Sequence, residues 1–209
     1  MRTKKSPLSI RILYWLTNIA FGLIFLITTV VFFLNLFFMT GLFTEEIQLR
    51  VQMPVPIEVV EHGSLELEGD DLIVRIEEAY GKLHFVDTPF YIYKIVARIL
   101  FLVLLIALFM TWKFRLFMKN LRNGLLFEIQ NINNLKHIAY GIVGLWLLTR
   151  IYMQLLYSTV VKNIEFATVN IGDQVSDFDD VLVVALFLWV LAHVFIKGLE
   201  MKEEQELTV

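Results

Sequence analysis

Two arginines stand inside stretches of the sequence that otherwise carry almost no charge. Arg98 precedes a long apolar run, and Arg150 lies within another. If both stretches are helices, a rise of about 1.5 Å per residue places the two guanidinium groups at similar depth in a membrane. An ionisable side chain at membrane depth is a candidate for function. Together with Gln154, the arginines predict a basic pocket for an anionic ligand or a lipid headgroup.

The acidic residues before the last apolar run allow a second interpretation of these arginines. In this interpretation, which we favour, Asp179, Asp180 or carboxylates of the loops pair with the arginines and tie the β unit to the bundle. Asp177, Asp179 and Asp180 also offer the hard oxygen ligands that suit calcium or magnesium. Their spacing does not resemble a calcium loop, and the helix dipole favours acids at a helix N-terminus. We therefore predict no metal site and no cofactor.

No catalytic constellation is found in the sequence. There is no Gly-rich phosphate loop, no His-Glu-x-x-His and no Gly-x-Ser-x-Gly, and the absence of Cys excludes a thiolate nucleophile. His193 has no carboxylate at its own depth, so we interpret it as a hydrogen-bonded structural histidine rather than part of a proton relay. We predict that the protein has no catalytic residues and is not an enzyme.

Composition indicates which elements position these residues. The chain has 209 residues, of which 57% are hydrophobic and 19% charged, and its apolar residues are bunched into four runs long enough to cross about 30 Å of hydrocarbon. The expected fold is a mainly α membrane protein, a four-transmembrane-helix bundle with a small antiparallel β unit on the extracytoplasmic side. The predicted segments are a basic N-terminus with transmembrane helix 1 (1–43), the β unit (44–90), helix 2 (91–122), a connector (123–136), helix 3 (137–157), a second outer loop with one strand (158–178), helix 4 (179–199) and an acidic tail (200–209).

Several polar residues in and around the apolar runs predict helix ends and contacts. Asn18 and Asn35 interrupt the first run and are expected to make interhelical hydrogen bonds. Gly124 is expected to serve as the C-cap of the second helix. The third helix is expected to begin near Glu128, before its membrane-crossing part. The tail either continues the fourth helix as a charged stub or serves as a peptide handle.

The segment between the first two runs has the pattern of a small sheet. Glu46–Met53 alternates between polar and apolar residues, which predicts a half-buried strand. Pro54 and Pro56 are expected to close it, and turns are expected at His62–Ser64 and again at 68–71. We further expect Ile164–Thr168, in the second loop, to join this sheet as a strand.

The distribution of basic residues predicts the sidedness of the membrane segments. Lys and Arg in short loops mark the cytoplasm, and they concentrate at the N-terminus and in the connector between the second and third runs: Arg2, Lys4, Lys5, Arg11, Lys113, Arg115, Lys119, Arg122 and Lys136. Both termini are therefore predicted to be cytoplasmic. The net charge of −3 argues against direct nucleic-acid binding, which needs a basic surface.

Two stretches of the sequence resemble a known family. Residues 127–140 have the order F-x3-N-I-x2-L-K-x-I-x-Y, and residues 194–209 read VFIKGLEMKEEQELTV. With the four-span layout, these stretches resemble the bacterial membrane family called domain of unknown function 2975, whose usual patterns are FxxxNIxxLKxIxY and VFxxGxxLKxEQxLTV. The sequence departs from the family at Met201, where leucine is common, and at His193, where an acidic residue is frequent.

The resemblance implies a cellular location but no catalysed reaction. It implies a multi-pass protein of the bacterial cytoplasmic (inner) membrane, and no enzyme activity is assigned to the family. Its members are commonly encoded beside a small helix-turn-helix regulator. We therefore predict a membrane-embedded sensor or interaction partner of such a regulator, surrounded by the lipid bilayer. The predicted partner-binding residues are Phe127, Asn131, Leu135, Lys136, Glu203, Glu204 and Leu207.

Two other classes of function fit the same layout. One is a small transporter or channel component, as a single chain or a homo-oligomer, which requires polar residues from several spans to converge on one path. The other is a structural subunit of an envelope complex. An intramembrane enzyme is the least favoured.

Overall fold

The computed structural model describes residues 7–40, 52–67, 70–84, 90–159, 162, 164, 170–171 and 178–207. The chain divides into two compact units. Unit 1 comprises Met1–Phe43, Lys94–Leu148 and Phe178–Val209, and unit 2 comprises Thr44–Tyr93 and Thr149–Asp177.

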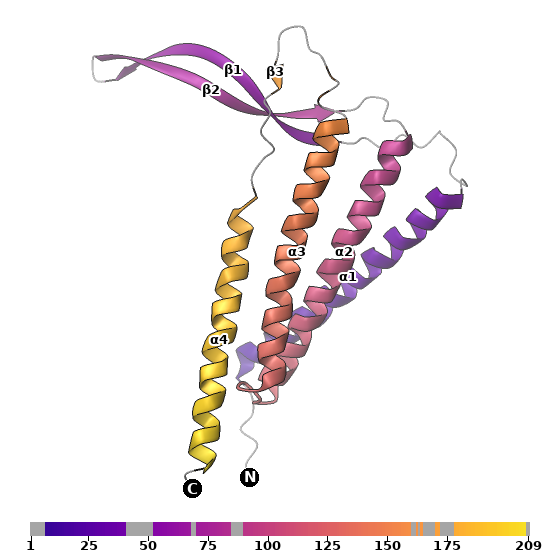
Figure 1. Ribbon diagram of the computed structural model, residues 1–209, viewed down its shortest axis with the longest axis vertical. Coiled ribbons are helices and arrows are strands. Elements are labelled where there is room, and N and C mark those ends of the chain that lie inside the picture. The colour runs from indigo at the N-terminus through magenta and orange to yellow at the C-terminus, as the bar shows by residue number, and fades with distance from the viewer. Residues whose placement is uncertain are drawn as a thin grey trace. The chain divides into compact units, whose positions relative to one another are not determined.

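Four long helices and a small sheet follow one another along the chain, from indigo α1 to yellow α4 in Figure 1. The helices are α1 (Leu8–Thr40), α2 (Phe90–Arg122), α3 (Ile129–Thr159) and α4 (Asp180–Leu207). All four are long and apolar enough to cross a membrane. The 33 residues of α1 make a helix about 50 Å long, which exceeds the roughly 30 Å of a hydrocarbon core. The predicted four apolar helices of membrane-spanning length are thus confirmed.

The main core of unit 1 lies at the end that carries the α2–α3 loop (Figure 1). Its buried members come from three helices: Phe117, Met118, Ile132, Leu135 and Ala192. Ile10 and Tyr14, from the first turns of α1, pack against them, as do Phe195 and Leu199 of α4. The beginning of α1, the α2–α3 loop and the second half of α4 therefore meet at one end of this unit.

A second, smaller cluster extends this core along the helices. Ile138, Ile142 and Ala185 are buried there, with Met110 packed against them. Gly141 lets α3 approach α2 closely, because a Cβ at this position would lie 2.9 Å from the Sδ of Met110. A larger residue at this position would require the side chain of Met110 to move.

The loop between α2 and α3 is short because α2 ends in a tight cap. Gly124 has a φ of +80°, a left-handed conformation that glycine adopts without steric cost. The N–H of Leu125 donates to the carbonyl of Asn120, and the N–H of Gly124 donates to that of Leu121. These are the two hydrogen bonds of a Schellman motif. The predicted C-cap at Gly124 is confirmed, and α3 begins at Ile129, as expected from Glu128.

The sheet of unit 2 is a long hairpin with one added strand. β1 (Gln52–Leu67) pairs antiparallel with β2 (Asp70–His84), and β3 (Asn170–Ile171) pairs antiparallel with the other edge of β1. The strand order is β2-β1-β3, and a bulge interrupts the β1–β2 register between Glu58 and Glu61. The predicted small antiparallel β unit is confirmed.

Two details of the predicted sheet are wrong. β1 does not close at Pro54 and Pro56 but runs through both, opposite Lys82 and Tyr80. Residues two apart in an antiparallel strand direct their backbone nitrogens to the same edge, so the two prolines remove donors from one edge only. The turn expected at 62–64 is also absent, because these residues pair with 73–75 in the middle of the hairpin.

The second loop joins the sheet as predicted, but through different residues. Ile57 pairs with Ile171, and Glu58 with Asn170. Ile164, where the strand was expected to begin, is not in a strand, and 165–169 lie outside the described residues. Glu46–Val51, most of the first predicted strand, also lie outside them.

Candidate functional site

Asn131 ties the α2–α3 loop to the start of α3. Its side chain is fully buried, and its Nδ2 donates to the carbonyls of Leu125 and Leu126, the second at 3.1 Å. Its Oδ1 accepts a hydrogen bond of 2.9 Å from the Nδ2 of Asn120, on α2. A buried amide is tolerated when its donors and acceptors are satisfied. Asn131 therefore stabilises the helical hairpin formed by α2, the α2–α3 loop and α3, because it joins the loop to both helices.

The two family-like stretches of the sequence meet at Phe127. This loop residue precedes α3, and its ring lies edge-on to the ring of Phe195, on α4, with centroids 5.7 Å apart. The ring also lies over Gly198, where a Cβ would be 2.6 Å from Cδ1 of Phe127. Phe195 in turn stacks on Phe117 of α2 at 6.2 Å. Gly198 thus opens the space that the ring of Phe127 fills, and α4 is fixed to the α2–α3 loop.

Beyond this contact, α4 continues as an exposed helical stub, defined here as Glu200–Leu207. Glu203 and Glu204 are exposed, and Leu207 is 86% exposed. At the base of the stub, Lys197 and Glu200 form an exposed ion pair at 2.6 Å. Of the two alternatives for the tail, the structure shows the first, since α4 continues as a charged helix to Leu207.

The structure divides the predicted partner-binding residues into two groups. Asn131 and Leu135 are buried and Phe127 and Lys136 half-buried, all in or beside the hairpin core. The others, Glu203, Glu204 and Leu207, are exposed on the stub. Partner binding stays a prediction for both groups. The second group offers exposed side chains to a partner, whereas Asn131 and Leu135 are covered by the packing of α2, α3 and the loop between them.

α1 is attached to α2 by polar contacts at both of its asparagines. The Nε of Arg115 donates to the Oδ1 of Asn18 at 2.6 Å, and the Nδ2 of Asn35 donates to the carbonyl of Ala97 at 3.2 Å. Arg122 lies 5.0 Å from the ring centroid of Tyr14. The predicted interhelical hydrogen bonds of Asn18 and Asn35 are confirmed.

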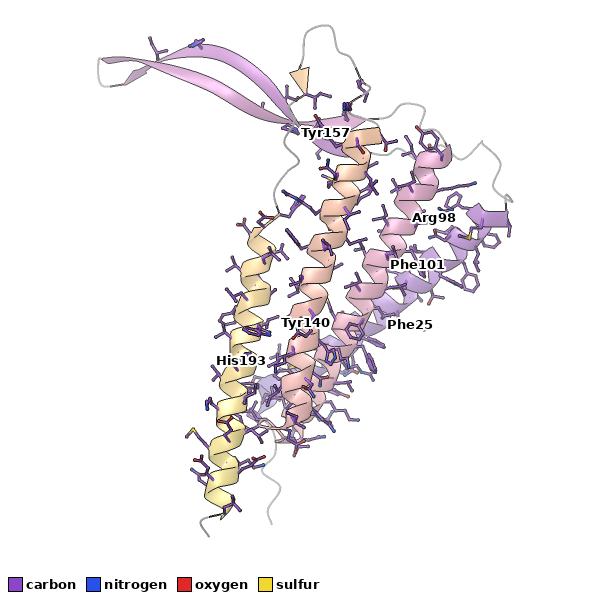
Figure 2. The ribbon with its side chains drawn as sticks, in the orientation of Figure 1. Phe25, Arg98, Phe101, Tyr140, Tyr157 and His193 are labelled. Carbon is purple, nitrogen blue, oxygen red and sulfur yellow. The ribbon has the colours of Figure 1, made fainter. Side chains whose placement is uncertain are left out.

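The predicted ligand pocket stays a prediction. Arg98 is exposed on α2, one turn before Phe101 (Figure 2), and belongs to unit 1. Arg150 and Gln154 are exposed on the part of α3 that belongs to unit 2. Of the acids proposed as their partners, Asp179 accepts a hydrogen bond of 2.9 Å from the indole Nε1 of Trp146.

His193 is hydrogen-bonded within its own helix, as predicted. Its Nδ1 lies 2.8 Å from the carbonyl of Trp189, and its ring lies 4.3 Å from that of Trp189. The side chain is exposed on α4 (Figure 2) rather than enclosed in the bundle. This local hydrogen bond anchors the imidazole to α4.

Sequence reasoning missed the roles of Asn120, Phe195 and Gly198. A glycine inside a helical pattern often has a packing reason, so Gly198 carried a usable signal. The ring that covers it comes from a distant loop, and no local pattern identifies that partner. The role of Asn120 could not be predicted from the sequence, because an asparagine in the last turn of a helix is common.

Comparison with protein families matches residues 72–209 to the family described as Protein of unknown function (DUF2975). The match begins in β2 and includes α2, α3, α4 and both motif stretches. No curated protein and no solved structure matches the chain. The matched region covers more than half of the sequence, and on this evidence the chain belongs to the DUF2975 family.

Proposed function

We propose that this protein is a multi-pass protein of the bacterial cytoplasmic membrane that holds a small helix-turn-helix regulator through the stub of α4. Both termini and the α2–α3 loop would be cytoplasmic, and the sheet would face outward and sense the envelope. The grouping of the α1 start, the α2–α3 loop and the second half of α4 in one core supports a common side for these three parts. Their basic residues favour the cytoplasm.

The observation that carries the proposal is the continuity of α4. One helix runs from Asp180 to Leu207, so the apolar span and the acidic stub belong to a single element. The contact between Phe127 of the α2–α3 loop and Phe195 of α4 attaches the second half of α4 to that loop. The stub is therefore a helical extension of the fourth apolar span rather than a separate peptide. The acidic stub suits a partner with a basic face, because complementary charge favours association.

Co-purification tests the proposal. The full chain is extracted in mild detergent after co-expression with a small helix-turn-helix regulator of the kind encoded beside members of the family, and the recovered regulator is quantified. Glu204→Gln removes one negative charge from the face of the stub that carries Leu207, and Leu207→Asp removes the apolar side chain. Gln205→Lys is the matched control, because it makes the same change in net charge as Glu204→Gln at a neighbouring position on another face.

The expected result is reduced recovery of the regulator with Glu204→Gln and Leu207→Asp, and normal recovery with Gln205→Lys. A loss of about 1 kcal/mol of binding free energy would lower the affinity roughly fivefold. Recovery that is equal for all three variants and the parent protein would contradict the proposal.

The transporter or channel alternative gains no support from the polar residues of unit 1. That function requires these groups to line a shared path. Asn18 and Asn35 instead bond α2 at separate positions, and His193 lies on the exposed surface of α4. We therefore favour the interaction role.

A further inference from the structure

A polar groove lies between α2 and α3, next to their connecting loop. It has a volume of about 410 Å³, and its polar lining includes Lys113, Lys119 and Asn120 from α2 and Asn133, Asn134 and His137 from α3. Residues three or four apart share one face of a helix, and this spacing recurs in the lining from each helix. The groove is therefore formed by two polar faces that oppose one another, at the edge of an otherwise apolar bundle.

The charge of this groove has one sign. Its lining, drawn from the described part of the chain, contains two lysines and no carboxylate. Two ammonium groups in one concave surface, with no carboxylate among its described lining residues, favour an anion.

Asn134 is a second, independent sign of a ligand. Its side chain lines the groove but is only 6% exposed. Within the described residues, no protein group forms a hydrogen bond with its amide. A buried amide without a partner destabilises the fold, and such a group in a native protein is commonly satisfied by a water or a ligand. Asn131, three residues earlier, is by contrast fully used within the hairpin.

The residues beside the groove are of the types found at the headgroup level of a membrane. The ammonium of Lys113 lies 4.8 Å from the ring centroid of Trp112 and 5.4 Å from that of Phe109. Trp112 is 43% exposed, and tryptophan is enriched at the headgroup level of membranes. His137 donates from Nδ1 to the carbonyl of Asn133 at 2.6 Å, because a carbonyl only accepts.

We propose that the groove between α2 and α3 binds a phosphate anion, held by Lys119 and Lys113 and by the amides of Asn134 and Asn133. Phosphate offers several acceptor oxygens and no obligatory donor, which matches ammonium and amide N–H groups. Two sources share this chemistry: the headgroup of an anionic lipid, and free phosphate or a small phosphorylated solute. This site is separate from the proposed regulator contact on the stub, and either one can fail without the other.

Native mass spectrometry of the full chain in detergent tests the proposal. One arm titrates dioleoyl phosphatidylglycerol against zwitterionic dioleoyl phosphatidylcholine, and a second arm titrates inorganic phosphate. Both arms use the parent protein, Lys119→Gln, Lys119→Arg and the control Lys136→Gln. Lys136 lies on the same helix as Asn134 but outside the groove lining, so its variant makes the same charge change elsewhere. Circular dichroism and gel filtration establish that each variant is folded.

Loss of one charge-assisted hydrogen bond is expected to weaken binding about tenfold. The proposal is supported when Lys119→Gln shows this loss, Lys119→Arg retains most of the binding and Lys136→Gln matches the parent. That pattern with phosphatidylglycerol identifies a lipid headgroup as the source, and the same pattern with inorganic phosphate alone identifies a soluble one. Equal losses in Lys119→Gln and Lys136→Gln, or no binding of either probe to the parent, would overturn it.

Discussion

The contact between Gly198 and Phe127 makes a prediction with a definite sign. In Gly198→Ala, the new Cβ would lie 2.6 Å from Cδ1 and 3.2 Å from Cζ of Phe127. Both distances are shorter than ordinary carbon–carbon contacts of about 3.5–4.0 Å. The ring must therefore move, although it is held against Phe195 of α4. The substitution tests whether the loop and α4 are packed at native density.

The magnitude follows from two opposing effects. Overpacking a well-filled core destabilises by about 1–3 kcal/mol, whereas replacing glycine with alanine inside a helix stabilises by about 1 kcal/mol. The expected net effect is a loss of about 1 kcal/mol in the free energy of unfolding. Gly144 is the matched control. It is also helical, but a Cβ added there would meet nothing within 4 Å, so Gly144→Ala is expected to stabilise.

The assay is thermal or denaturant unfolding of the purified full chain in one detergent, with both alanine variants measured beside the parent. A second background, Phe127→Ala, completes a double-mutant cycle. Without the ring, Gly198→Ala is expected to change sign and to behave like Gly144→Ala. If the effect of Gly198→Ala is the same with and without the ring, the close contact does not exist and the reasoning is refuted.

Two further predictions concern the asparagines of α3. Asn131→Asp removes the donor to the carbonyls of Leu125 and Leu126 and should lower the free energy of unfolding by at least about 2 kcal/mol, measured in the same assay; an unchanged stability would show that these hydrogen bonds are dispensable. Asn134→Leu removes a buried amide that has no described protein partner and should leave the ligand-free protein equally stable or about 1 kcal/mol more stable. The same variant should lose any stabilisation by phosphatidylglycerol or phosphate, and a large loss of stability without either probe would instead indicate an unrecognised structural bond.

The helices could be predicted from the sequence because lipid imposes a simple rule on composition. A span needs about 20 apolar residues, so four apolar runs sufficed to predict α1 to α4. Their ends followed from local chemistry, as in the glycine cap at Gly124. The sheet was harder, since β1 passes through Pro54 and Pro56, which argue locally against a strand. The edge to which a proline nitrogen points depends on the pairing, and pairing is not visible in a single strand.

The candidate site could be predicted only in part, because it depends on contacts between distant segments. Asn131 and Phe127 stand out as parts of a motif, but the motif does not say which side chains are buried. The groove could not be predicted because Lys113 and Lys119 indicate only sidedness in the sequence, and Asn133 and Asn134 fall between or beside motif positions. The lysines of α2 and the asparagines of α3 face one another only when the α2–α3 loop brings the two helices together.

The meeting of the two motif stretches changes how the motifs are best explained. Asn131, Ile132 and Leu135 are almost fully buried, so their residue types are accounted for by packing and by hydrogen bonds inside the chain. No such account covers Glu203 or Leu207, because a solvent-exposed helix end tolerates most residue types. A motif position that the fold does not explain is the better candidate for binding another molecule. The stub is therefore the part of the motif where substitution should impair partner binding and spare stability, whereas substitution in the hairpin core should impair stability first.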